Sequence, residues 1–109
     1  MINEFIKNKQ FTEAYTEFIK LHPHDQAELL KDLELLDQVR LLNKMNDEEL
    51  SELLSYLDSS DSAKLIMELD LERQKQILDN MDIDDAVDII DELEKDDQDT
   101  LLNILAEQE

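Results

Sequence analysis

The stretch that decides the fold is 82–93, which reads Asp-Ile-Asp-Asp-Ala-Val-Asp-Ile-Ile-Asp-Glu-Leu. Its first residue, Asp82, is of a type that caps helix N-termini, and the acid at the fourth position, Asp85, falls in the first turn, where a carboxylate is favoured. The apolar residues at positions eight, nine and twelve lie on one face of a helix. This pattern predicts one short amphipathic helix.

The same pattern recurs every twelve residues without an insertion. The units begin at His22, Glu34, Asn46, Asp58, Asp70, Asp82 and Glu94. Positions eight, nine and twelve are Leu, Ile or Met in every unit, and position four is acidic in all units but one, where Arg73 stands. Twelve residues hold a helix of about nine residues and a joint, and so short a helix needs neighbours to be stable. We therefore predict an all-α, solenoid-like superhelix of short stacked helices.

The residues before the repeats have a different composition. All three Phe residues lie in 1–21, where an apolar helical spacing starts at Phe11 and Thr12 is a candidate N-cap. Because terminal units of solenoids need a cover, we predict that 1–21 is an N-terminal capping helix segment. The repeat domain is then 22–105, followed by a frayed tail at 106–109.

Charge narrows the classes of partner. Thirty Asp and Glu against ten Lys and Arg give a formal charge of −20, which argues against binding to DNA, RNA or anionic lipid. Divalent cations or basic proteins are the partners that such a surface favours. A strongly acidic chain can be disordered instead, but the strict apolar spacing favours a packed domain.

Several other functions find no support in the sequence. The chain has no Cys and no Gly, so it has no thiolate metal site and no Gly-rich phosphate loop, and we do not expect an enzyme. No signal peptide or membrane-spanning run is visible, which predicts a soluble chain. His22 and His24 are two residues apart and do not share a helical face, which favours a solvated or capping role over a metal site.

The acidic residues of unit six are the remaining candidates for chemistry. Asp84, Asp88 and Asp91 form an outward row, while Asp82 and Asp85 are assigned to the cap and first turn. Mg²⁺ commonly binds through one or two carboxylates and keeps several waters. The row is also tolerable without a ligand, because exposed like charges one turn apart cost only about 0.2–0.5 kcal/mol per pair. Spacing alone leaves both interpretations open.

Two segments carry a resemblance to a known family. Leu-His-Pro-His-Asp-Gln-Ala-Glu-Leu-Leu at 21–30 and Met-Asp-Ile-Asp-Asp-Ala-Val-Asp-Ile-Ile-Asp-Glu-Leu at 81–93 resemble the cytosolic N-terminal domain of the MgtE family of magnesium transporters. The likeness extends over about 21–105, although the Leu-Pro-Pro joints frequent in the family are replaced here by Asp-led joints. It implies a superhelix on the cytoplasmic side of the membrane, within a homodimer that carries CBS domains and a pore.

The resemblance also implies a site and a mechanism. In the family this domain docks on the CBS domains of the same transporter through bound Mg²⁺, and loss of the ions separates them and opens the pore. By motif position, Asp84 and Asp88 match metal-contacting acids and Glu52 matches a third, with acids of the CBS domains as further ligands. The alternative is a protein-interaction scaffold without metal, similar in architecture to FliG-type domains of the flagellar motor switch. The sequence downstream would discriminate the two hypotheses.

Overall fold

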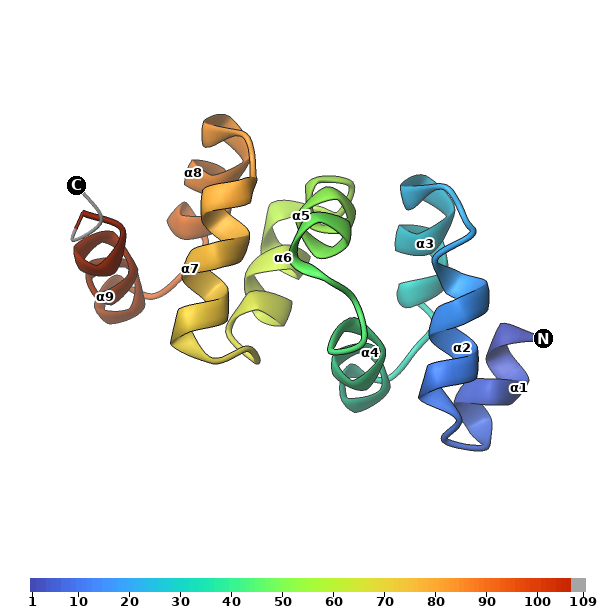
Figure 1. Ribbon diagram of the computed structural model, residues 1–109. Coiled ribbons are helices and arrows are strands. Elements are labelled where there is room, and N and C mark those ends of the chain that lie inside the picture. The colour runs from blue at the N-terminus through green and yellow to red at the C-terminus, as the bar shows by residue number, and fades with distance from the viewer. Residues whose placement is uncertain (107–109) are drawn as a thin grey trace.

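The computed structural model describes residues 1–106, and these residues form nine helices and no strand (Figure 1). The helices are α1 (Ile2–Lys7), α2 (Phe11–Phe18), α3 (Pro23–Leu30), α4 (Leu35–Leu42), α5 (Asp47–Ser55), α6 (Ser59–Ile66), α7 (Leu71–Asn80), α8 (Ile83–Asp91) and α9 (Lys95–Ala106). The predicted all-α superhelix is confirmed. Of the predicted tail, Ala106 is the last residue of α9, and 107–109 lie outside the described residues.

The helices form two rows along an elongated body of 43 × 22 × 21 Å (Figure 1). Helix α1 packs on α2, and from α2 onward each helix packs on its next-but-one neighbour in the chain. The sequence α3, α5, α7, α9 makes one row, and α2, α4, α6, α8 makes the other. The core lies between the rows, so every unit in the middle of the array is covered by units on both sides.

The twelve-residue register is confirmed at the helix starts. The first residue of each unit from His22 to Asp82 is the N-cap of its helix. Side chains complete the cap in three of these helices: the acceptors are His22, Asn46 and Asp70. The side chain of Asp82 makes no such bond, so the prediction that it caps its helix is wrong, although its backbone holds the N-cap position.

The joints turn without glycine. The backbone N–H groups at positions eleven and twelve donate to the carbonyls at positions eight and nine, as in Lys44 to Leu41 (3.1 Å) and Met45 to Leu42 (3.0 Å). These are tightened i to i−3 bonds, which satisfy carbonyls that a helix end otherwise leaves unpaired. Within 1–106 only Lys9, between α1 and α2, has a positive φ, of 60°.

The residue at position five of the repeat makes a hydrogen bond that the twelve-residue pattern does not predict. The Gln38 amide donates to the Leu30 carbonyl (2.6 Å), and the Ser62 hydroxyl donates to the Leu54 carbonyl (2.7 Å). The amides of Gln26, Gln74 and Gln98 donate to carbonyls at the end of the preceding helix or in the joint that follows it. Five units therefore bond to the unit before them through a side chain at the same position.

The apolar positions behave as the pattern predicts, with one exception. Positions eight, nine and twelve are buried or half-buried in all units except at Leu102, which is 51% exposed. Helices inside the array have a neighbour on each side in their row, whereas α9 packs chiefly on α7. Leu102 therefore lacks the cover that its equivalent Leu54, 1% exposed, receives.

The N-terminal segment contains two helices, and one of them continues the repeat. The N-cap of α2 is Gln10 rather than Thr12, so the predicted cap was wrong by two residues. Gln10 lies twelve residues before His22, which puts α2 in register with the units that follow. Glu17 stands at position eight of this unit, where the other units have an apolar residue. Because Glu17 is polar at this position, the unit did not match the repeat pattern. The role of 1–21 as a cap stays a prediction.

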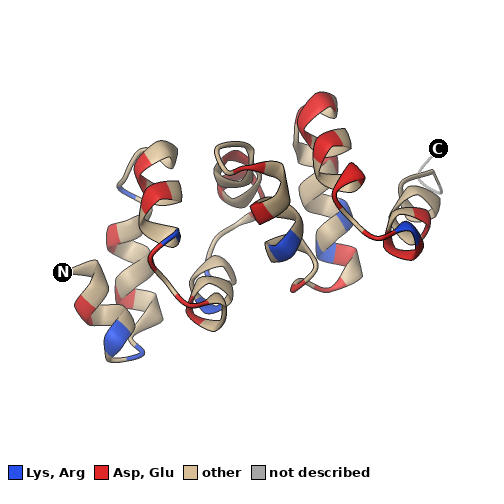
Figure 2. Ribbon diagram, turned by 180° about the vertical axis from the view of Figure 1, so that it is seen from behind, with Lys and Arg blue, Asp and Glu red and all other residues tan. Residues whose placement is uncertain are grey.

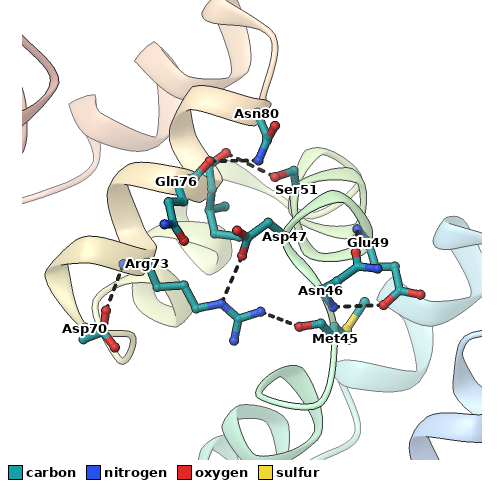
Figure 3. A network of polar contacts seen from close by, with 10 residues as sticks. Met45, Asn46, Asp47, Glu49, Ser51, Asp70, Arg73, Gln76 and Asn80 are labelled. Atoms are coloured by element: carbon teal, nitrogen blue, oxygen red, sulfur yellow. Dashed lines mark hydrogen bonds and ion pairs between the residues drawn. The ribbon is translucent and has the colours of Figure 1, made fainter. Parts of the chain in front are cut away.

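Arg73, the single departure from the acidic rule at position four, links α7 to the start of α5 (Figure 3). Its guanidinium donates to the Asp47 carboxylate, with Nε and Oδ1 3.3 Å apart, and to the Met45 carbonyl. Its backbone N–H is capped by Asp70. An acid at this position would face the Asp47 carboxylate, so the exception follows from packing between the units.

Tyr15 provides a second polar link between distant units. Its hydroxyl donates to the carboxylate of Glu49, at 2.9 and 3.0 Å from the two oxygens. This hydrogen bond, with burial and the carboxylate charge as smaller causes, raises the pKa of the Tyr15 phenol.

Among the described residues, none of the helices is both long and apolar enough to cross a bilayer.

Candidate metal site at the start of helix α8

The two acids predicted on α8 are both exposed. Asp84 lies in the first turn, and Asp88 follows one turn later on the same helix. Asp91, at the end of α8, is exposed as well, and the rear view shows acidic residues along this helix (Figure 2). The predicted row is therefore present at the surface.

The third predicted ligand, Glu52, is exposed on α5 and lies near the start of α8. It lines a hollow of about 220 Å³ together with Asp82 and Asp85. Asp84 lines an adjoining hollow with the same two aspartates, and Asp88 lines a third hollow with Asp85. All three predicted residues thus lie around Asp85.

The chemistry of these hollows suits a hard cation. No Lys or Arg lines any of the three. Between the acids, the Ser51 hydroxyl donates to the Ile77 carbonyl (3.1 Å), and the Asn80 amide donates to the Gln76 carbonyl (3.1 Å; Figure 3). The carboxylates of Glu52, Asp84 and Asp88 are exposed to solvent, and carboxylate oxygens are ligands that Mg²⁺ prefers.

The predicted residues do not converge on one point. Glu52 and Asp84 line different hollows, and no group of three or more His, Cys, Asp or Glu side chains within 1–106 is arranged to hold a metal ion. The described chain thus offers separate carboxylates rather than a complete cage. That Glu52, Asp84 and Asp88 bind Mg²⁺ stays a prediction.

Three acids at these hollows were not among the predicted ligands. Asp82 and Asp85 had been assigned to the cap, and Glu48 of α5 lines the hollow of Glu52. A periodicity of twelve shows which face a residue takes on its own helix, but not that the start of α8 lies beside α5. The pattern therefore held no signal for this contact.

The histidines have the structural role that their spacing favours. The Nδ1 atom of His22 accepts the backbone N–H of His24 at 3.0 Å, which caps α3. The ring of His22 also meets the Tyr56 ring edge to face, with centroids 5.5 Å apart. The predicted capping role is confirmed for His22, and His24 is exposed.

These features define a class of protein: an acidic helical-repeat domain whose outer face carries unpaired carboxylates. A family model described as the MgtE intracellular N domain matches residues 21–109. That match covers most of the chain, and the chain belongs to this family. The resemblance seen in the sequence is confirmed, and the match starts within one residue of the first predicted unit.

A solved structure agrees with this assignment at the level of the fold. It is described as the crystal structure of the soluble part of a magnesium transporter, and it superposes with a TM-score of 0.80 at 24% sequence identity. The alignment covers 95% of this chain and 41% of that one, so the chain spans about two-fifths of the length of its neighbour. No protein with a curated description matches the chain.

Proposed function

We propose that this chain is the cytosolic, Mg²⁺-sensing domain of a homodimeric magnesium transporter and that it docks on CBS domains of the same protein to close the pore. The observation that carries the proposal is the family match over 21–109. The exposed carboxylates around Asp85, with no basic residue lining their hollows, support it. No catalytic activity is part of this function.

The roles of the residues follow from charge. Asp84, Asp88 and Glu52 would hold Mg²⁺, which supplies positive charge between two acidic surfaces. Without a cation these carboxylates would repel the acids of a docked partner. A surface that carries only part of a ligand set binds the ion better when docked than when free. Such differential affinity is what lets an ion shift a conformational equilibrium.

The test is limited proteolysis of the complete transporter over a series of Mg²⁺ concentrations. In the wild type, rising Mg²⁺ should protect the segment between the helical domain and the CBS domains. The double variant Asp84→Asn and Asp88→Asn should need more Mg²⁺ for the same protection. It should also leave the pore open at concentrations that normally close it.

A matched control separates the site from general loss of charge. Glu13→Gln with Glu17→Gln removes two acids spaced one turn apart on α2, which lies toward the opposite end of the body from α8 (Figure 1). This pair should keep the Mg²⁺ dependence of the wild type. An identical dependence in the Asp84 and Asp88 variant would refute the site assignment.

A metal-free scaffold is the second candidate, and one observation favours it. Ile83 and Val87 lie one turn apart on α8 and are 79% and 48% exposed. Apolar side chains so exposed suit direct contact with another protein. If docking on the CBS domains persists unchanged in a chelator, the scaffold hypothesis replaces the sensing one.

A further inference from the structure

A groove on the row of even-numbered helices has an apolar surface that the proposed sensing function does not use. It has a volume of about 460 Å³ and runs beside α6, between the start of α4 and the joint before α9. An adjoining hollow of about 190 Å³ shares Leu35 and Lys64 with it and continues toward α3. We call the two together the α6 groove.

The floor of the α6 groove is apolar and partly open to solvent. Ala63 and Leu93 are buried beneath it, at 5% and 9% exposure. Leu35 and Met67 stand in it with 46% and 38% of their surface exposed. Leu35 is the first residue of α4 and Met67 is the C-cap of α6, so an apolar group seated between them would contact both segments.

The rim of the α6 groove is acidic. In the larger hollow Glu68, Glu92, Glu94 and Asp97 stand against one base, Lys64, and the smaller hollow adds one acid, Asp61, and one base, Lys31. None of the four carboxylates of the larger hollow has an ion pair or a side-chain hydrogen bond with another residue of 1–106. Three of the four lie in or next to the joint between α8 and α9, so the negative charge gathers at one end of the apolar floor.

We propose that the α6 groove binds a basic amphipathic helix, whose apolar side chains seat on Leu35 and Met67 and whose Lys or Arg side chains pair with the rim. A helix laid in an apolar groove is a common mode of peptide recognition. Charge complementarity sets the sign of the partner, because an acidic segment would meet unpaired carboxylates. A second copy of this chain, with a formal charge of −20, would repel.

The floor distinguishes this groove from the acidic hollows at α8. The hollow beside Glu52 has Met81 as its only apolar lining residue, whereas the larger hollow of the α6 groove has Leu35, Ala63, Met67 and Leu93. A cation alone suits the hollow. A peptide with both charge and apolar surface suits the groove.

The test is a titration of the 109-residue chain, labelled with ¹⁵N, with a synthetic peptide of Leu and Lys in amphipathic helical order. A scrambled peptide of the same composition, without an apolar face, is the control ligand. Amide shifts should concentrate on α6 and on the joint before α9. The scrambled peptide should bind about tenfold more weakly.

Two pairs of substitutions assign the contact. Leu35→Gln with Met67→Gln makes the floor polar at exposed positions and should weaken binding about tenfold. Ile83→Gln with Val87→Gln changes two exposed apolar residues on α8 instead and should leave the affinity unchanged. Circular dichroism of each variant confirms that the helices are retained.

Each remaining result would overturn the proposal. Shifts spread evenly over the acidic surface, equal affinity for the two peptides, or equal effects of the two pairs would mean nonspecific attraction by net charge. A dimer of the free chain that the Leu35 and Met67 pair disrupts would mean that a second copy occupies the groove. These outcomes concern α6 and leave the Mg²⁺ dependence at Asp84 and Asp88 untouched.

Discussion

Truncation of a core leucine tests the repeat architecture most directly. Leu53 is 0% exposed at position eight of the unit that starts at Asn46, and its helix α5 packs on α3, α6 and α7. Leu→Ala at buried sites costs about 2–5 kcal/mol, and the cost is larger where the cavity cannot close. Because α5 packs on three other helices, we expect that a shift of one of them would not fill the cavity. Leu53→Ala should therefore cost about 3–5 kcal/mol, a large part of the stability of an ordinary domain.

The assay is urea denaturation, followed by far-UV circular dichroism and by tyrosine fluorescence to check that both probes report one transition. Leu102→Ala is the matched control, because it changes the same residue type at a repeat position that is 51% exposed. It should cost about 1 kcal/mol or less. If Leu53→Ala costs about 0.5 kcal/mol, as surface changes do, or if the two variants cost the same, the assignment of buried positions is refuted.

Four other predictions follow from the polar groups. Arg73→Ala should cost about 1.5–3 kcal/mol in urea unfolding, because it removes charge-assisted bonds to the start of α5, and Arg73→Lys should recover only part. The hydrogen bond to Glu49 raises the pKa of Tyr15 above its ordinary value of 10.0. The contribution of this bond to the stability of the fold is therefore present below that pH and is lost as pH rises through the raised pKa of the folded state. Between pH 9 and pH 12, the urea midpoint of Tyr15→Phe should fall less than that of the wild type. Thermal melting should shift upward from low to moderate NaCl, since salt screens the repulsion of a chain at −20, and no shift would mean that attractive pairs dominate. Asp84→Asn with Asp88→Asn should leave the melting temperature of the isolated domain unchanged or slightly higher, and a clear loss would show that these acids support the fold.

The sequence predicted the repeat well because its signal is local. A short polar residue followed by apolar residues at fixed offsets determines where a helix starts and which face is buried. The starts at Asn46 and Asp70, with their side-chain caps, could be predicted from this pattern. The burial of Leu53 and Leu54 could be predicted in the same way.

What could not be predicted depends on contacts between units. The partners of Arg73 lie 26 and 28 residues away in sequence, and no short-range sequence pattern in either unit indicates the contact. The unit that starts at Gln10 was missed because Glu17 breaks the apolar rule. For the candidate site, the row of Asp84 and Asp88 could be predicted as exposed. That this row lies close to α5 could not be predicted, because the proximity arises from how the rows of helices stack.

The hydrogen bonds at position five suggest how such an array can grow. A unit that carries a donor at position five and carbonyl acceptors at its end presents both halves of the same connection, as Gln38 and Leu30 do. A duplicated segment of twelve residues would therefore join its copies with no new chemistry at the seam. Length in this architecture can change by whole units through gene duplication, and each seam with a donor at position five keeps its pairing.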